Sequence, residues 1–192
     1  PGLRAAPAGE QEEAGRFGAA LAVNFGLALA AMYGLIALAF ESWTRPLLVL
    51  AMVPFGLVGA ILGHAALGLD LTLLSMFGII GLSGVVVNGA LLIVTVVQRE
   101  EAAGCPPLAA IERATLSRFR PVLLTTLTTF LGVTPIILEQ SVQAQFLVPT
   151  AVSLGFGILV VLIFQMTLVP ALCALHAGAR RRLRGRPIAR VA

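Results

Sequence analysis

Few side chains in this sequence could do chemistry, and the clearest candidates lie within or beside long apolar stretches. Within 71–97, Asn88 and Thr95 are seven residues apart and therefore share one face of a helix. Within 121–138, Thr125 and Thr129 belong to a second polar stripe. Because an unpaired polar group is costly in an apolar interior, we expect both stripes to face the inside of a helix bundle and to line a hydrogen-bonded seam. The candidate site residues are Ser83, Asn88, Arg118, Thr125 and Thr129.

The two stripes also have a simpler interpretation. A serine or threonine hydroxyl inside a helix can donate to the carbonyl four residues earlier, which needs no second helix. For the threonines both interpretations stay open. The amide of Asn88 cannot be satisfied so locally, so we expect Asn88 to bond a neighbouring helix, with Thr125 as the best-placed partner, directly or through one water.

An enzyme active site finds little support. The segment GLSG at 81–84 has the GxSG pattern found around the nucleophile of rhomboid-type intramembrane proteases, which needs a histidine within hydrogen-bond reach. Ser83 should lie ~18 Å along its stretch at 1.5 Å per residue, whereas His64 and His176 lie near the ends of theirs. The sequence has no HExxH, phosphate loop, CxxC or pair of carboxylates within one apolar stretch. We expect no catalytic residue, no metal and no cofactor.

The composition requires a membrane. The chain has 192 residues, 58% of them hydrophobic and 11% charged, with a mean hydropathy of +0.98. A bilayer core takes about 20 apolar residues as a helix, and five stretches reach that length. We predict an all-α membrane protein with a transmembrane domain over 17–177 and spans at about 17–40, 46–69, 71–97, 121–138 and 146–175.

The arginines orient these spans. All 13 basic residues are arginines, and if five spans alternate, all except Arg4 and Arg16 fall on one side. By the positive-inside rule that side is the cytoplasm, which holds the connector 98–120 and the basic tail 178–192. This placement explains the net charge of +4 without nucleic acid as a partner. It also puts Cys105 and Cys173 on the reducing side, where we expect free thiols.

The remaining segments are short. We expect 107–118 to form an amphipathic helix along the cytoplasmic interface, with a solvated connector as the alternative. The segment 1–16 begins with Pro1, has no signal-peptide pattern, and is expected to be the remnant of a preceding outer domain in a longer protein. Small residues at four-residue spacing in 18–34, and Gly59 with Gly63, predict close helix packing. Pro54, Pro135 and Pro170 predict kinks or breaks.

Several of these segments resemble one family. AFESWTRPLLVLAMVPFGLVGA, GIIGLSGVVVNGALLIV, RFRPVLLTTLTTFLGVTPIIL and LVPALCAL occur in this order and are similar to successive helices of resistance-nodulation-division (RND) efflux pumps. The resemblance covers 16–177. It implies a bundle equivalent to helices eight to twelve of a trimeric bacterial inner-membrane pump, driven by protons and embedded in the lipid bilayer. The N-terminal half, which carries the essential aspartates, would lie elsewhere in the protein.

The resemblance also implies roles for the candidate residues. Asn88 falls where many drug-exporting members have a lysine that pairs with the aspartates, and Thr125 and Arg118 fall on the threonine and arginine of the proton-relay helix. With Gly89 and Thr95 nearby, the helix has no ionisable group. Relay chemistry here would then be hydrogen-bonded and neutral, altered or partly lost. The heavy-metal branch usually has a glutamate in this helix, so its absence favours the hydrophobe and amphiphile branch.

Two functions remain open from the sequence. One is a proton-driven multidrug exporter of hydrophobic or amphiphilic compounds, with a periplasmic adaptor and an outer-membrane channel as its partners. The other is an inactive or truncated relative that serves as a membrane-embedded structural or interaction module.

Overall fold

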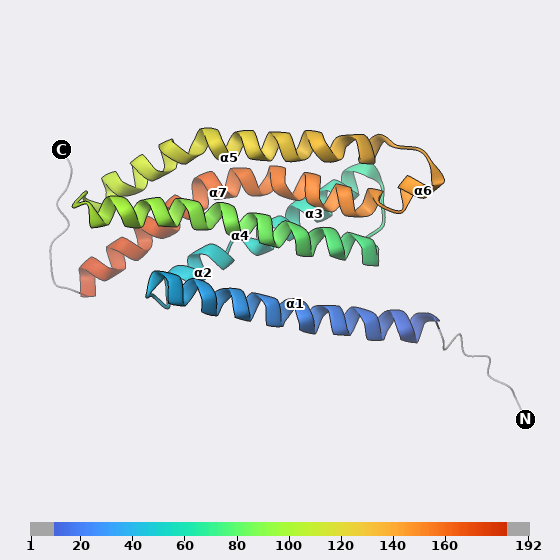
Figure 1. Ribbon diagram of the computed structural model, residues 1–192, viewed down its shortest axis with the longest axis horizontal. Helices are drawn as coiled ribbons and strands as arrows, with labels where there is room; N and C mark the ends of the chain where they lie inside the picture. The colour runs from blue at the N-terminus through green and yellow to red at the C-terminus, as the bar shows by residue number, and fades with distance from the viewer. Residues whose placement is uncertain (1–9, 184–192) are drawn as a thin grey trace, which may run out of the picture.

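The computed structural model describes residues 10–183 and is helical throughout this range apart from short connections (Figure 1). The helices are α1 (Glu10–Phe40), α2 (Arg45–Leu50), α3 (Val53–Leu67), α4 (Leu73–Ala102), α5 (Pro107–Leu138), α6 (Val142–Gln145) and α7 (Val148–Leu183). Five stretches are long and apolar enough to span a bilayer: Gly15–Phe40, Arg45–Leu67, Leu73–Ala102, Pro107–Leu138 and Val148–Ala179. The predicted five-helix, all-α membrane fold is confirmed. The outermost parts of the predicted segments 1–16 and 178–192 lie outside the described residues.

The second span is interrupted as its proline predicts. Helix α2 ends at Leu50, and α3 begins at Val53 with Pro54 in its first turn. Proline has no N–H to donate to the carbonyl four residues earlier, but it fits the first turn of a new helix. Pro135 and Pro170, in contrast, lie inside α5 and α7 and end neither helix.

The connector before the fourth span differs from the prediction. The sequence suggested a separate helix over 107–118, whereas α5 runs without interruption from Pro107 to Leu138 and passes through Pro121. Its first turns are inclined to the rest of the helix (Figure 1), as expected where a proline removes one backbone hydrogen bond. Ala110, Ile111 and Ala114 are buried, so these turns pack against protein with their apolar face. That packing continues the helix beyond the predicted span.

Helix α7 is the centre of the bundle, where it packs against α3, α4 and α5. The contact with α3 is made through glycines, because Gly59 of α3 faces the Cα of Gly157. Small residues allow such close approach of two backbones. The largest fully buried side chains include Met52, Leu82, Ile93, Val86, Val161 and Val169.

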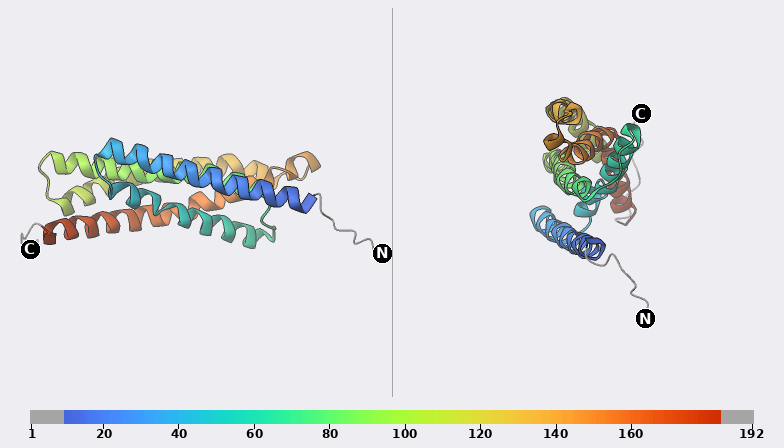
Figure 2. Two further views of the ribbon diagram at one scale, coloured as in Figure 1. Left: turned by 90° about the horizontal axis from the view of Figure 1, so that it is seen from below. Right: turned by 90° about the vertical axis from the view of Figure 1, so that its right-hand side faces the viewer.

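Helix α1 lies beside the bundle and packs mainly on α2 (Figure 2). Its glycines at 18, 26 and 34 have no neighbouring atom where a Cβ would be, so this ladder packs on no described helix. Leu35 and Leu38 are 69% and 78% exposed. Apolar faces of this size need lipid or another protein surface to cover them.

The two ends of the bundle match the predicted sidedness. The turn between α4 and α5 lies at the same end as the last turns of α7, and the turn between α3 and α4 lies at the other end with α6 (Figure 1). The arginine-rich segments of the described chain are therefore together, which is the arrangement that the positive-inside rule requires.

Candidate functional site: a polar cavity between three helices

Helices α4, α5 and α7 line a cavity of about 150 Å³. Its polar lining comes from one residue of α4, three of α5 and one of α7. These are Asn88, Arg118, Thr125, Thr126 and Gln165. The remaining lining is apolar, apart from Gly89, and comes from Val85, Val86, Leu92, Pro121, Val122, Ile158 and Val161.

Three predicted site residues meet in this cavity. Asn88 and Thr125 both line it, although both side chains are exposed, and Arg118 is half-buried. The Thr125 hydroxyl donates to the Pro121 carbonyl at 2.9 Å. Within the described chain, no hydrogen bond joins Asn88 directly to Thr125. The two residues thus share a cavity large enough for water.

The other two predicted residues lie outside it. The Ser83 hydroxyl donates to the Ile80 carbonyl at 2.6 Å, and Ser83 is buried away from the cavity. Thr129 is half-buried and does not line the cavity. Thr128 donates to the Leu124 carbonyl at 2.8 Å, so the simpler interpretation of the threonine stripe describes this residue.

Sequence reasoning missed two lining residues. Thr126 is 3% exposed, and Gln165 is 4% exposed with no hydrogen-bond partner for its amide Nε2. A lone glutamine in the long apolar stretch 148–179 was the available indication, because buried amides are rare and need partners. Gln165 belongs to no stripe of polar residues, and a repeated polar spacing is what made the other candidates visible in the sequence.

Gly89 explains how the glutamine fits. A Cβ at Gly89 would overlap the side-chain amide of Gln165, so the amide occupies the space that a larger residue would fill. The glycine of α4 and the glutamine of α7 are therefore matched. Together they place the Gln165 amide at the wall of the cavity, against the residue that follows Asn88 in the sequence.

A second polar cluster lies near the opposite end of the bundle from the arginines. His64 Nδ1 lies 2.9 Å from the Ala60 carbonyl, to which it donates, and Ser75 Oγ lies 2.8 Å from His64 Nε2. The Ser75 hydroxyl also caps α4 by accepting from the Thr72 N–H at 3.1 Å. His64 and Ser75 are 2% and 0% exposed. No substrate could reach this pair, and the only serine of the GxSG segment bonds its own helix, so the geometry indicates packing rather than protease chemistry.

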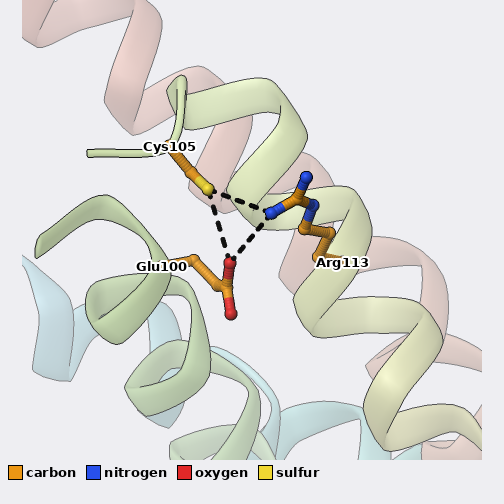
Figure 3. A network of polar contacts seen from close by, with 3 residues as sticks. All are labelled: Glu100, Cys105 and Arg113. Atoms are coloured by element: carbon orange, nitrogen blue, oxygen red, sulfur yellow. Dashed lines mark hydrogen bonds and ion pairs between the residues drawn. The ribbon is translucent and has the colours of Figure 1, made fainter. Parts of the chain in front are cut away.

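A third cluster lies at the turn between α4 and α5 (Figure 3). Arg113 Nη1 lies 3.6 Å from Glu100 Oε2 and donates to Cys105 Sγ at 3.2 Å, while the Cys105 thiol donates to Glu100 Oε2 at 3.5 Å. Nearby, Arg45 Nη2 lies 3.7 Å from Glu101 Oε2. The contacts among Glu100, Cys105 and Arg113 stabilise the turn between α4 and α5, and the Arg45–Glu101 pair joins α2 to α4. Both Cys105 and Cys173 are free.

In the part of the chain that the structure describes, no group of three or more histidine, cysteine, aspartate or glutamate residues could hold a metal ion. The polar chemistry of the cavity is therefore limited to amides, hydroxyls and one guanidinium.

The comparisons with known proteins agree with this arrangement. The sequence pattern of the AcrB/AcrD/AcrF family matches residues 1–177. The chain belongs to this family of RND transporters. The family consists of membrane transporters and not enzymes, and it accounts for the five spans.

Two relatives place the chain within the family. It is 29% identical over 154 residues to the multidrug resistance protein MdtC of Erwinia amylovora, covering 80% of this chain and 15% of that protein. A crystal structure of a heavy-metal efflux pump matches with a TM-score of 0.77 and 29% identity, over 85% of this chain and 16% of that one. The chain spans only a small part of the length of either AcrB/AcrD/AcrF relative. One relative is named as a multidrug resistance protein and the other as a heavy-metal efflux pump, so the predicted preference between branches stays a prediction.

Proposed function

We propose that this chain forms helices eight to twelve of a proton-driven RND exporter of hydrophobic or amphiphilic compounds in a bacterial inner membrane. The observation that carries the proposal is the cavity between α4, α5 and α7, within the apolar spans, that Asn88, Arg118 and Thr125 line together. Polar groups at such depth are costly and usually mark ion or substrate pathways. The whole pump would be a homotrimer that meets an adaptor and an outer-membrane channel through domains outside this chain.

In this proposal the cavity supplies hydrogen bonds and one positive charge. None of its lining residues is an acid, so in this proposal the acid that gains and loses the proton approaches from beyond the cavity lining, as the resemblance to RND pumps implies. The Arg118 guanidinium would stabilise the ionised form of such an acid, because an opposite charge nearby favours the charged state. Asn88 and Thr125 would bond the same acid or a water attached to it.

The amphiphile branch is favoured over the metal branch by the chemistry of the side chains. Metal export along the bundle would need soft or anionic ligands, and the cavity presents only neutral amides, hydroxyls and a guanidinium. The two relatives do not decide between the branches, because one is named as a multidrug resistance protein and the other as a heavy-metal efflux pump.

Substitution of Asn88 in the full-length transporter tests the proposal. Asn88→Leu should strongly reduce proton-coupled efflux in inverted vesicles while expression and trimer formation stay normal, because leucine removes an amide from the cavity. Thr95→Val is the matched control on the same helix, since the Thr95 hydroxyl donates to its own Leu91 carbonyl at 2.8 Å and lies outside the cavity. Unchanged efflux in Asn88→Leu would reduce Asn88 to a packing residue. Absence of efflux in the unsubstituted transporter would favour the inactive structural module.

A further inference from the structure

The buried amide of Gln165 has no role in the proposal above. Gln165 is 4% exposed, its Nε2 has no hydrogen-bond partner in the described chain, and it lines the cavity with Asn88 and Arg118. An unsatisfied buried donor is destabilising, so a partner is expected in the working protein. The other polar residues that line the cavity are Asn88, Arg118, Thr125 and Thr126, so the partner can be one of these residues or a water between them.

The Gln165 amide lies against Gly89 at the wall of the cavity. Gly89 leaves room for it, and any side chain at position 89 would collide with the carboxamide. Val161, which also lines the cavity, lies one helical turn earlier on α7 and is 1% exposed. The free donor of Gln165 can therefore be satisfied from the cavity that its side chain borders.

The cavity can hold that partner. A buried water needs only about 10–15 Å³ of accessible space and two to four polar neighbours, and this cavity has about 150 Å³. Its polar groups come from three helices, with the Asn88 amide on α4, Arg118 and Thr125 on α5, and Gln165 on α7. Water bonded to Gln165 would have neighbours on both other helices.

We propose that Gln165 is a positioning residue that anchors water in this cavity, and that the anchored water connects α7 to the polar groups of α4 and α5 along the proton path. The inference rests on the proposed function, which it extends to a third helix. Gln165 does not carry the proton itself. It orders the water through which Asn88 and Arg118 act.

Two substitutions test this from opposite sides of the contact. Gln165→Leu removes the amide, and Gly89→Ala displaces it while leaving the glutamine in the sequence. In the full-length transporter each should lower the maximal rate of proton-coupled efflux about tenfold, as expected for the loss of one hydrogen bond in the transition state. The substrate KM should stay the same, and the pH profile of transport should shift. Gln165→Asn should restore part of the rate, because it returns an amide on a shorter side chain.

Thr167→Val is the matched control on α7, since the Thr167 hydroxyl is exposed and donates to the Ile163 carbonyl at 2.8 Å. This variant should transport like the unsubstituted protein. If Asn88→Leu impairs efflux but Gln165→Leu and Gly89→Ala behave like Thr167→Val, the role of Gln165 is wrong while the proposed function stands. If the unsubstituted transporter shows no proton-coupled efflux, the proposed function itself fails.

A structural readout keeps the inference testable without transport. An electron cryo-microscopy map of the full-length transporter, at a resolution that shows water, should contain density within hydrogen-bond distance of the Gln165 amide, and this density should disappear in Gln165→Leu. A direct bond between Gln165 and a side chain from another part of the protein would overturn the water-anchoring role. So would an amide with no density beside it.

Discussion

The contact between α3 and α7 at Gly59 gives the sharpest prediction on stability. A Cβ at Gly59 would lie 2.8 Å from the Gly157 Cα and 2.8 Å from the Val160 Cβ. Nonbonded carbons prefer about 3.5–4.0 Å, so Gly59→Ala should push the helices apart by roughly 0.7 Å or more. Overpacking of this kind costs about 1–3 kcal/mol, which is partly offset because alanine favours a helix over glycine by up to about 1 kcal/mol.

Gly81→Ala provides the matched control, because a Cβ there would meet no atom within 4 Å. Both variants gain the same helix propensity, so their difference isolates the packing term. We expect Gly59→Ala to be less stable than Gly81→Ala by about 1–3 kcal/mol. The measurement is an SDS titration of a full-length transporter in which Cys173 is the single cysteine, Cys105 having been replaced. The Cys173 thiol is 7% exposed, so its labelling by a thiol reagent reports when the bundle opens. Equal labelling midpoints in the two variants would show that α3 and α7 are not tightly packed at Gly59.

Two further predictions concern hydrogen bonds near the end of the bundle opposite the arginines. Ser75→Ala should lower the free energy of unfolding by about 1–3 kcal/mol in the same titration, since it leaves Nε2 of the buried His64 without its partner; a change within error would mean that the ring finds another donor. At Glu139, the backbone N–H groups of Ser141 and Gln140 donate to the carboxylate at 3.1 Å, and with the Ser141 bonds as the larger cause they lower the pKa of Glu139. The stabilisation of this loop should therefore be present above the ordinary glutamate pKa and be lost as the pH falls through the lowered pKa of Glu139. Amide hydrogen exchange at Ser141 should accordingly rise only in acid, and Glu139→Gln should remove this pH dependence. A rise centred above the ordinary glutamate pKa would contradict the assignment.

Much of the fold was accessible from the sequence because lipid imposes simple requirements on it. Length and apolar content predict five spans, and the arginine distribution predicts which connections lie together. The continuation of α5 was not accessible in this way. Residues 107–120 are too polar to count as a span, and the packing of Ala110 and Ala114 that keeps them helical is a tertiary contact.

The site was predictable only where polar residues repeat. Asn88, Arg118 and Thr125 were named from spacing and from the resemblance, and they line one cavity. Gln165 was not predicted as a site residue, because a single glutamine in an apolar stretch has no periodicity. The position of the Gln165 amide depends on Gly89, which lies on a different helix. A contact between residues 76 positions apart leaves no pattern in either segment of the sequence.

The polar residues that line the cavity are buried on one side of it and exposed on the other. Thr126 and Gln165 are 3% and 4% exposed, whereas Asn88 and Thr125 on the same cavity are exposed. Thr126 of α5 and Gln165 of α7 are therefore enclosed by this chain, whereas Asn88 of α4 and Thr125 of α5 lie on the exposed side of the cavity. Water held at Gln165 would lie on the enclosed side, where its exchange is slow, and an acid from another part of the transporter could approach only from the side of Asn88 and Thr125. In the proposed function, protons that pass between such an acid and Arg118 would use water ordered by Gln165 of α7. A substitution on α7 should therefore lower transport although it does not contact the acid.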